Sequence, residues 1–94
     1  MAGKFPFEWD PEKALENRLR HNVSFHEAAT AFRDRLSRTI QDAGHSDDEE
    51  RFTLIGFSQF GRLLGAAHAE RQDRIRLISA RLASKRERRE HEEG

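Results

Sequence analysis

Arginine and aliphatic residues alternate near the C-terminal end of the chain, in a pattern that could present cations to a ligand. In a strand over residues 74–80, Arg74 and Arg76 would point to one face and Ile75 and Leu77 to the other. The aliphatic pair should pack under helices, which leaves both arginines on the open face. Guanidinium groups are planar, permanently charged donors that suit phosphate. A solvated sheet face is an equally good interpretation of the same alternation.

A histidine and a glutamate on the preceding predicted strand could move protons beside these arginines. The small residues just before His68 would leave a shallow depression beside its side chain. Glu70 would point to the same face of the strand as His68. Arg51 begins another strand, directly after Glu50. Cutting RNA without a metal needs a base near the 2′-hydroxyl, cations around the phosphorane and an acid for the departing 5′-oxygen. These residue types fit that chemistry, although a lone histidine on a strand is more often a hydrogen-bonded bystander.

Other kinds of active site have less support in the sequence. None of the five histidines has a second ligand at the spacing of a zinc-binding helix, so we expect no metal and no cofactor. The glycines lie in predicted strands and turns rather than in a phosphate-binding loop, and no serine lies in a nucleophile elbow. The absence of cysteine excludes disulfides, thiolate zinc sites and cysteine nucleophiles.

The composition predicts one small domain over residues 1–94 with an uneven distribution of charge. The net charge is zero. Residues 1–61 hold 8 basic and 11 acidic residues, whereas residues 62–89 hold 9 basic and 3 acidic ones. A basic segment suits a polyanion such as RNA, or it forms an ordinary solvated face. With no cysteine, no apolar run of membrane-spanning length and no signal-peptide pattern, we expect a cytoplasmic protein without a membrane partner.

The predicted elements give an α+β fold, in which two N-terminal helices pack on one face of a three- to four-stranded antiparallel sheet. Asp10-Pro11 and the capping box Ser24–Glu27 mark the starts of the two helices. Ala14, Leu15 and Leu19 should form the apolar stripe of the first helix. Four strands are expected at 37–41, 51–57, 63–69 and 74–80, and a short edge strand at 5–9. Residues 85–94 contain no apolar side chain and should form a polar helix that frays until a partner binds.

Several ordered motifs resemble the BrnT family of type II toxins. They are Phe7–Ala14, Asn17, His21–Ala28, His45-Ser46, Glu50–Phe52, Ile55-Gly56, Gly61-Arg62, Glu70-Arg71, Ile75–Arg81 and Arg86–Arg89. The resemblance implies a RelE-like fold and an endoribonuclease that cleaves RNA and inhibits translation. It also implies a BrnA-like antitoxin that contains a ribbon-helix-helix DNA-binding part. The toxin would form an oligomeric complex with this antitoxin and would be brought to DNA only through it.

The family positions also imply two sets of functional residues. The catalytic set is Lys13, Glu50, Arg51, His68, Glu70, Arg76 and Arg81. The RNA-binding set is Arg62, Arg71, Arg74 and Arg86. Strict alternation would place Arg81 on the face of Ile75, so its membership requires a bulge, a twist or the end of the strand.

Two other functions fit parts of the sequence. One is a catalytically weak or inactive RNA-binding or interaction module, which would keep the fold without the activity. The chain has no tyrosine, so it cannot use the tyrosine that some RelE-like enzymes use for proton transfer, and this puts its catalytic strength in question. A helix-turn-helix reading of the two N-terminal helices is poor, because residues 1–61 are acidic overall and a recognition helix brings basic or amide groups to DNA.

Overall fold

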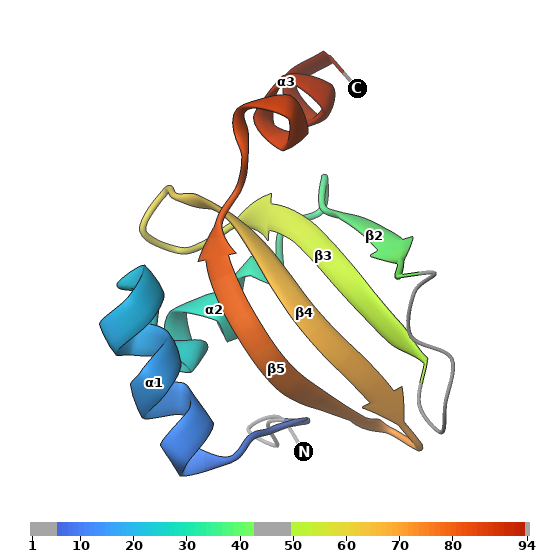
Figure 1. The fold of residues 1–94 in the computed structure, drawn as a ribbon. Coiled ribbons are helices and arrows are strands. Elements are labelled where there is room, and N and C mark those ends of the chain that lie inside the picture. The colour runs from blue at the N-terminus through green and yellow to red at the C-terminus, as the bar shows by residue number, and fades with distance from the viewer. Residues whose placement is uncertain (1–5, 43–49, 94) are drawn as a thin grey trace.

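The computed structural model describes residues 6–42 and 50–93, which form one sheet with three helices (Figure 1). The elements are β1 (Phe7–Glu8), α1 (Pro11–His21), α2 (Phe25–Ala31), β2 (Arg38–Gln41), β3 (Arg51–Phe57), β4 (Leu63–Arg71), β5 (Arg74–Leu82) and α3 (Lys85–Glu93). The strand order is β1-β5-β4-β3-β2. All neighbouring strands are antiparallel except β1 and β5, which run parallel.

The α+β class is confirmed, but the prediction of a three- to four-stranded antiparallel sheet was wrong. Within the edge strand predicted at 5–9, residue 5 lies outside the described residues, and Phe7–Glu8 pair with β5 as a fifth, parallel strand, with Phe7 opposite Ile75. The amide of Ile75 donates to the carbonyl of Pro6 at 2.8 Å. Because β5 is the last strand of the meander, its outer edge can pair with the N-terminal strand β1. The sequence did not indicate whether that pairing would be parallel or antiparallel.

The predicted helix starts are confirmed by their capping hydrogen bonds. The amide of Glu12 donates to the Asp10 carboxylate at 2.9 Å, and the amide of Glu27 donates to the Ser24 hydroxyl at 3.0 Å. Helix α1 ends at Asn22, which adopts the left-handed conformation with φ 59°. These local signals therefore fix where both N-terminal helices begin and where the first one ends.

The predicted arrangement of the helices was wrong, because only α2 lies across the sheet. Helix α2 contacts β3, β4 and β5, whereas α1 contacts the sheet through β5 and lies beside that strand (Figure 1). The predicted stripe on α1 is largely uncovered, with Leu15 59% and Leu19 79% exposed, and only Ala14 packs against the core. Phe25, Ala28 and Ala29 of α2 form the core with Leu64, Leu77 and their neighbours instead.

Helix α3 lies beyond the end of the sheet and has no buried residue (Figure 1). The polar C-terminal helix is thus present, while its fraying until a partner binds stays a prediction. Each helix in the described part of the chain is too short or too polar to span a bilayer.

A bulge in β5 decides which face its arginines occupy. Ala67 pairs with Ser79 and His68 pairs with Leu77, so Ile78 has no opposite residue. The extra residue resets the alternation, because Leu77 and Ala80 both belong to the core that packs under α2. Arg76 and Arg81 therefore both point to the other, open face. The bulge that the predicted role of Arg81 required is present.

Candidate active site

Three cations from three separate elements line one small hollow on the open face. Lys13 of α1, Arg51 of β3 and Arg76 of β5 surround it together with Asp10, and its volume is about 60 Å³. Arg51 lies opposite Ala69, and Ala69 lies opposite Arg76, so the two arginines share one row across the sheet. The small side chain of Ala69 leaves room above the sheet for both guanidinium groups.

The hollow has an excess of positive charge. Three permanent or near-permanent cations face one carboxylate, that of Asp10, which also caps α1. In the part of the chain that the structure describes, neither the Lys13 ammonium nor the Arg51 guanidinium forms an ion pair. Such an arrangement suits a bound anion, and two guanidinium forks suit the oxygens of a phosphate in particular.

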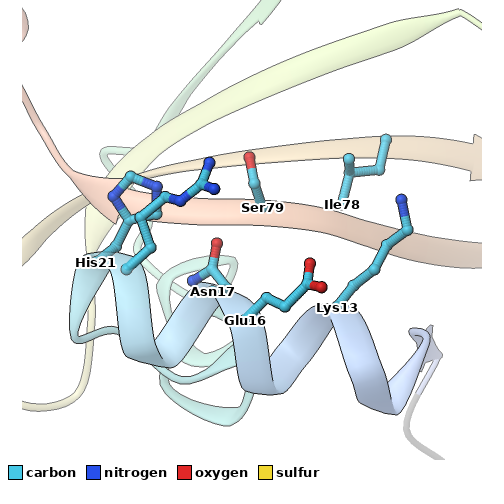
Figure 2. A pocket seen from close by; sticks show the side chains of 7 residues that line it. Lys13, Glu16, Asn17, His21, Ile78 and Ser79 are labelled. Carbon is cyan, nitrogen blue, oxygen red and sulfur yellow. The ribbon is translucent and has the colours of Figure 1, made fainter.

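A second hollow of about 160 Å³ adjoins the first along the seam between α1 and β5 (Figure 2). Lys13 and Ile78 line both hollows. The polar face of α1 forms one wall, and Ile78 and Ser79 of β5 form the other (Figure 2). The side chains on that wall of α1 are Lys13, Glu16, Asn17, Arg20 and His21.

A comparison with protein families decides what kind of protein carries this site. The sequence model described as "Ribonuclease toxin, BrnT, of type II toxin-antitoxin system" matches residues 9–87, which include every residue that lines the two hollows. The chain belongs to the BrnT family. The resemblance inferred from the motifs is thereby confirmed. The family is one of ribonuclease toxins, and a type II toxin-antitoxin system implies an antitoxin partner. Among curated proteins, no sequence matches the chain significantly.

In this member of the BrnT family, Arg81 lies on the predicted face but does not line either hollow. Its guanidinium lies against Gly65, where an added Cβ would come within 2.8 Å of Nη1. The Glu87 carboxylate of α3 accepts from both terminal nitrogens, at 2.8 Å and 3.0 Å. Hydrogen bonding to Arg81 lowers the pKa of Glu87 to about 2, and the same bond raises the pKa of Arg81. The guanidinium of Arg81 thus attaches α3 to the end of β5 through its ion pair with Glu87.

The pair of Arg81 and Glu87 predicts a pH-dependent contribution to stability. The folded-state pKa of Glu87 lies below the ordinary value of 4.5, so the contribution is complete above about pH 4.5 and is lost as the pH falls toward 2. Glu87→Gln should therefore lower the urea midpoint at pH 7, and the difference from the unmodified protein should narrow from pH 5 to pH 3.

The matched control for this titration is Glu90→Gln. Glu90 pairs with Arg86, whose side chain is 88% exposed, so solvent screens the interaction and the midpoint should hardly change at either pH. A Glu87→Gln difference that stays constant between pH 7 and pH 3 would contradict the assignment of the low pKa to this carboxyl.

His68 and Glu70 lie on the opposite face from the arginines, so the prediction that His68 adjoins the open-face cations was wrong. His68 is 1% exposed, and its ring lies 4.9 Å from that of Phe32 and 5.8 Å from that of Phe52. Its Nδ1 is 3.1 Å from the carbonyl of Ala66, and its Nε2 is 3.5 Å from the Glu70 carboxylate. The position agrees with the alternative interpretation of His68 as a hydrogen-bonded residue of the interior.

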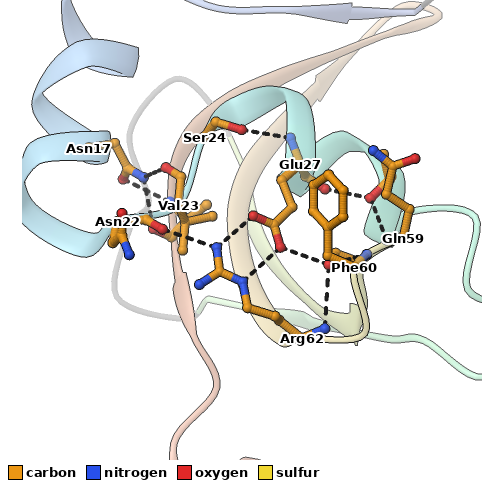
Figure 3. Close-up of polar contacts among 11 residues, drawn as sticks. Asn17, Asn22, Val23, Ser24, Glu27, Gln59, Phe60 and Arg62 are labelled. Atoms are coloured by element: carbon orange, nitrogen blue, oxygen red, sulfur yellow. Dashed lines mark hydrogen bonds and ion pairs between the residues drawn. The ribbon is translucent and has the colours of Figure 1, made fainter.

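Arg62, for which RNA binding stays a prediction, is part of a polar cluster near the helix connection (Figure 3). Its guanidinium donates twice to Glu27, at 2.6 Å and 2.9 Å, and once to the carbonyl of Asn22 at 3.0 Å. The Ser58 hydroxyl donates to the same carboxylate at 2.7 Å. The bond from Arg62 is the main cause of the lowered pKa of Glu27. Because Glu27 is only 5% exposed, Arg62 neutralises a buried charge.

The other predicted residues do not line the first hollow. Arg74 is on the open face two residues before Arg76, 54% exposed and 3.7 Å from the Glu8 carboxylate. Glu50 is exposed directly before Arg51. Arg71 is exposed at the end of β4, and Arg86 belongs to α3. Of the predicted residues, the first hollow brings together Lys13, Arg51 and Arg76.

Apart from Lys13, the residues of the second hollow were not predicted to be functional, although a signal was present. Glu16, Asn17 and Arg20 follow Lys13 at intervals of three, four and seven residues, which places them on one helix face. The apolar residues of α1 do not indicate what its polar face adjoins. His21 and Ser79 carried no comparable pattern, because their proximity depends on how α1 packs beside β5.

Proposed function

We propose that this BrnT-family chain is a metal-independent endoribonuclease that inhibits translation. The convergence of Lys13, Arg51 and Arg76 on one hollow is the observation that carries the proposal. In the reaction the 2′-oxygen attacks phosphorus, and the bond to the 5′-oxygen breaks. The two guanidinium groups stabilise the charge on the phosphorane without a metal ion. The described residues contain no cluster of three possible metal ligands.

The protons require separate groups. We assign Glu50 to the 2′-hydroxyl proton, because this carboxylate is exposed and directly precedes Arg51 in the chain. The Lys13 ammonium is a donor on the wall of the same hollow, and we assign it to the departing 5′-oxygen. Neither assignment involves His68 or Glu70, which lie behind the sheet.

The proposal includes the partner and the setting. Membership of a type II family implies an antitoxin, and we propose that it is BrnA-like, with a ribbon-helix-helix part that alone contacts DNA. We also propose a RelE-like fold and a cytoplasmic location. Leu15 and Leu19, exposed one turn apart on α1, offer apolar side chains that a protein partner could cover.

Cleavage in the presence of EDTA tests the mechanism. The purified chain should cut RNA in EDTA and leave 5′-hydroxyl ends, because a metal-free attack by the 2′-oxygen releases the 5′-oxygen. Activity that disappears in EDTA and returns with magnesium would reject the metal-free route. Induction in a bacterial host should arrest growth, and coexpression of a BrnA-like antitoxin should relieve the arrest.

One observation favours a second function, that of an inactive RNA-binding module. The guanidinium of Arg81 is held by Glu87, which leaves two arginines rather than three at the hollow. An inactive module would bind RNA without cutting it and would not arrest growth, so the same experiments separate the two functions.

A further inference from the structure

The polar face of α1 carries its charges in a fixed order beside β5. Lys13, Glu16 and Arg20 present a cation, a carboxylate and a cation along the wall of the second hollow. Lys13 and Arg20 are seven residues apart, which corresponds to about 10 Å along a helix. Lys13 also belongs to the first hollow, where the proposed function places the phosphate that is cut. The second hollow therefore continues directly from the proposed catalytic centre.

The charges in this hollow are open to a ligand. In the described residues, no ion pair joins Glu16 to Lys13 or to Arg20, although all three line the same space. The lining is mostly polar and includes Ser79 of β5 and His21 at the end of α1 (Figure 2). An apolar peptide or a purely anionic ligand would not match two cations separated by a carboxylate.

The wall is also rigid, because a buried side chain attaches α1 to β5. Asn17 lies between Glu16 and Arg20 on this face and is 6% exposed. Its amide donates to the carbonyl of Ala80 at 2.9 Å, and its oxygen accepts from the amide of Ala80 at 2.9 Å. The backbones on the two sides of the hollow are thus fixed relative to each other, which favours binding because less motion has to be lost.

We propose that the hollow between α1 and β5 is a subsite for the RNA backbone next to the cleaved bond. Arg20 holds the next phosphate on the 3′ side of the one at Lys13. The Glu16 carboxylate accepts a hydrogen bond from the 2′-hydroxyl of the ribose between them, which belongs to the departing nucleotide and is not the attacking group. A ribose–phosphate chain presents an anion, a hydroxyl donor and an anion in the same order as the side chains of the wall. The 2′-hydroxyl contact would also favour RNA over DNA. The inference rests on the proposed function and extends it to substrate binding.

Arg20→Ala tests the subsite, with Arg18→Ala as the matched control. Arg18 is an exposed arginine on the same helix, but it lines a different hollow with Trp9 and Leu15. With a single-stranded RNA of eight nucleotides, Arg20→Ala should raise KM about tenfold and leave kcat unchanged. The plot of log kcat/KM against log salt should become less steep by about 0.7, the value for one phosphate contact on a single strand. Arg18→Ala should change neither quantity.

Substrate length and sugar give two further readouts. A dinucleotide, which has only the phosphate that is cut, should be cleaved equally by Arg20→Ala and by the unmodified protein. Glu16→Ala, which removes the acceptor, should raise KM for RNA about fivefold without weakening inhibition by single-stranded DNA of the same sequence. An equal effect of Arg20→Ala and Arg18→Ala, or a loss in kcat rather than KM, would overturn the subsite.

Failure of the proposed function can be recognised separately. If the unmodified chain cuts no RNA of any length, the nuclease proposal fails, and fluorescence anisotropy with labelled eight-nucleotide RNA measures the same Arg20 effect on Kd. A tenfold weaker Kd for Arg20→Ala but not for Arg18→Ala would still support the subsite, and identical Kd values would overturn it.

Discussion

Arg76→Ala is expected to lower kcat/KM for RNA cleavage about 100-fold, while the melting temperature changes by no more than about 2 °C. Removing one preorganised donor from a developing oxyanion costs two to three orders of magnitude in other enzymes. Arg76 shares its hollow with Lys13 and Arg51, so the phosphorane would lose one of its two guanidinium partners. The side chain is on the open face rather than in the core, and its loss leaves no cavity. Steady-state cleavage of a defined RNA and thermal unfolding measure the two effects.

Arg74→Ala is the natural control for Arg76→Ala. Arg74 lies on the same strand and the same face, but it is 54% exposed, is close to Glu8 and does not line the hollow. Its loss should reduce kcat/KM by about threefold at most, through the weakened attraction of RNA. A structural role for Arg76 would be indicated if its removal lowered activity and melting temperature in parallel.

Features encoded by near neighbours in the chain could be predicted from the sequence. The caps at Asp10 and Ser24 depend on residues two or three positions away, and both are present. The alternation of β5 correctly placed Arg76 on the face away from Leu77, because both residues precede the bulge. The class of the fold and the family membership follow from signals of this kind, repeated along the chain.

Features that depend on distant partners could not be predicted. The side of the sheet that α2 covers determines that His68 is buried, and no pattern within β4 specifies it. The parallel pairing of β1 with β5 joins residues nearly 70 positions apart. Helical periodicity identified Leu15 and Leu19 as one apolar stripe, but it could not show that α1 lies at the edge of the sheet with this stripe uncovered.

Asn17→Ala is expected to lower the free energy of unfolding by about 3 kcal/mol. Three hydrogen bonds of 2.9 Å would be lost, two donated to the carbonyls of Val23 and Ala80 and one accepted from the amide of Ala80. Each buried group left without a partner costs about 1–3 kcal/mol, and some of that cost is recovered if water enters the adjoining hollow. For a domain of this size the loss corresponds to a decrease in Tm of roughly 15 °C, measured by calorimetry.

Two further variants identify the hydrogen bonds as the cause. Asn17→Asp keeps the volume of the side chain but directs a carboxylate at two carbonyl oxygens, so it should destabilise at least as much at pH 7. Burial raises the pKa of such a carboxyl, and its protonated form regains one donor, so the deficit of Asn17→Asp should shrink as the pH falls. Glu16→Ala, on the exposed side of the same turn, should leave Tm nearly unchanged. If Asn17→Asp were as stable as the unmodified protein at pH 7, the two donated bonds would not hold α1 to β5. The position of Lys13 at the proposed phosphate site would then need another explanation.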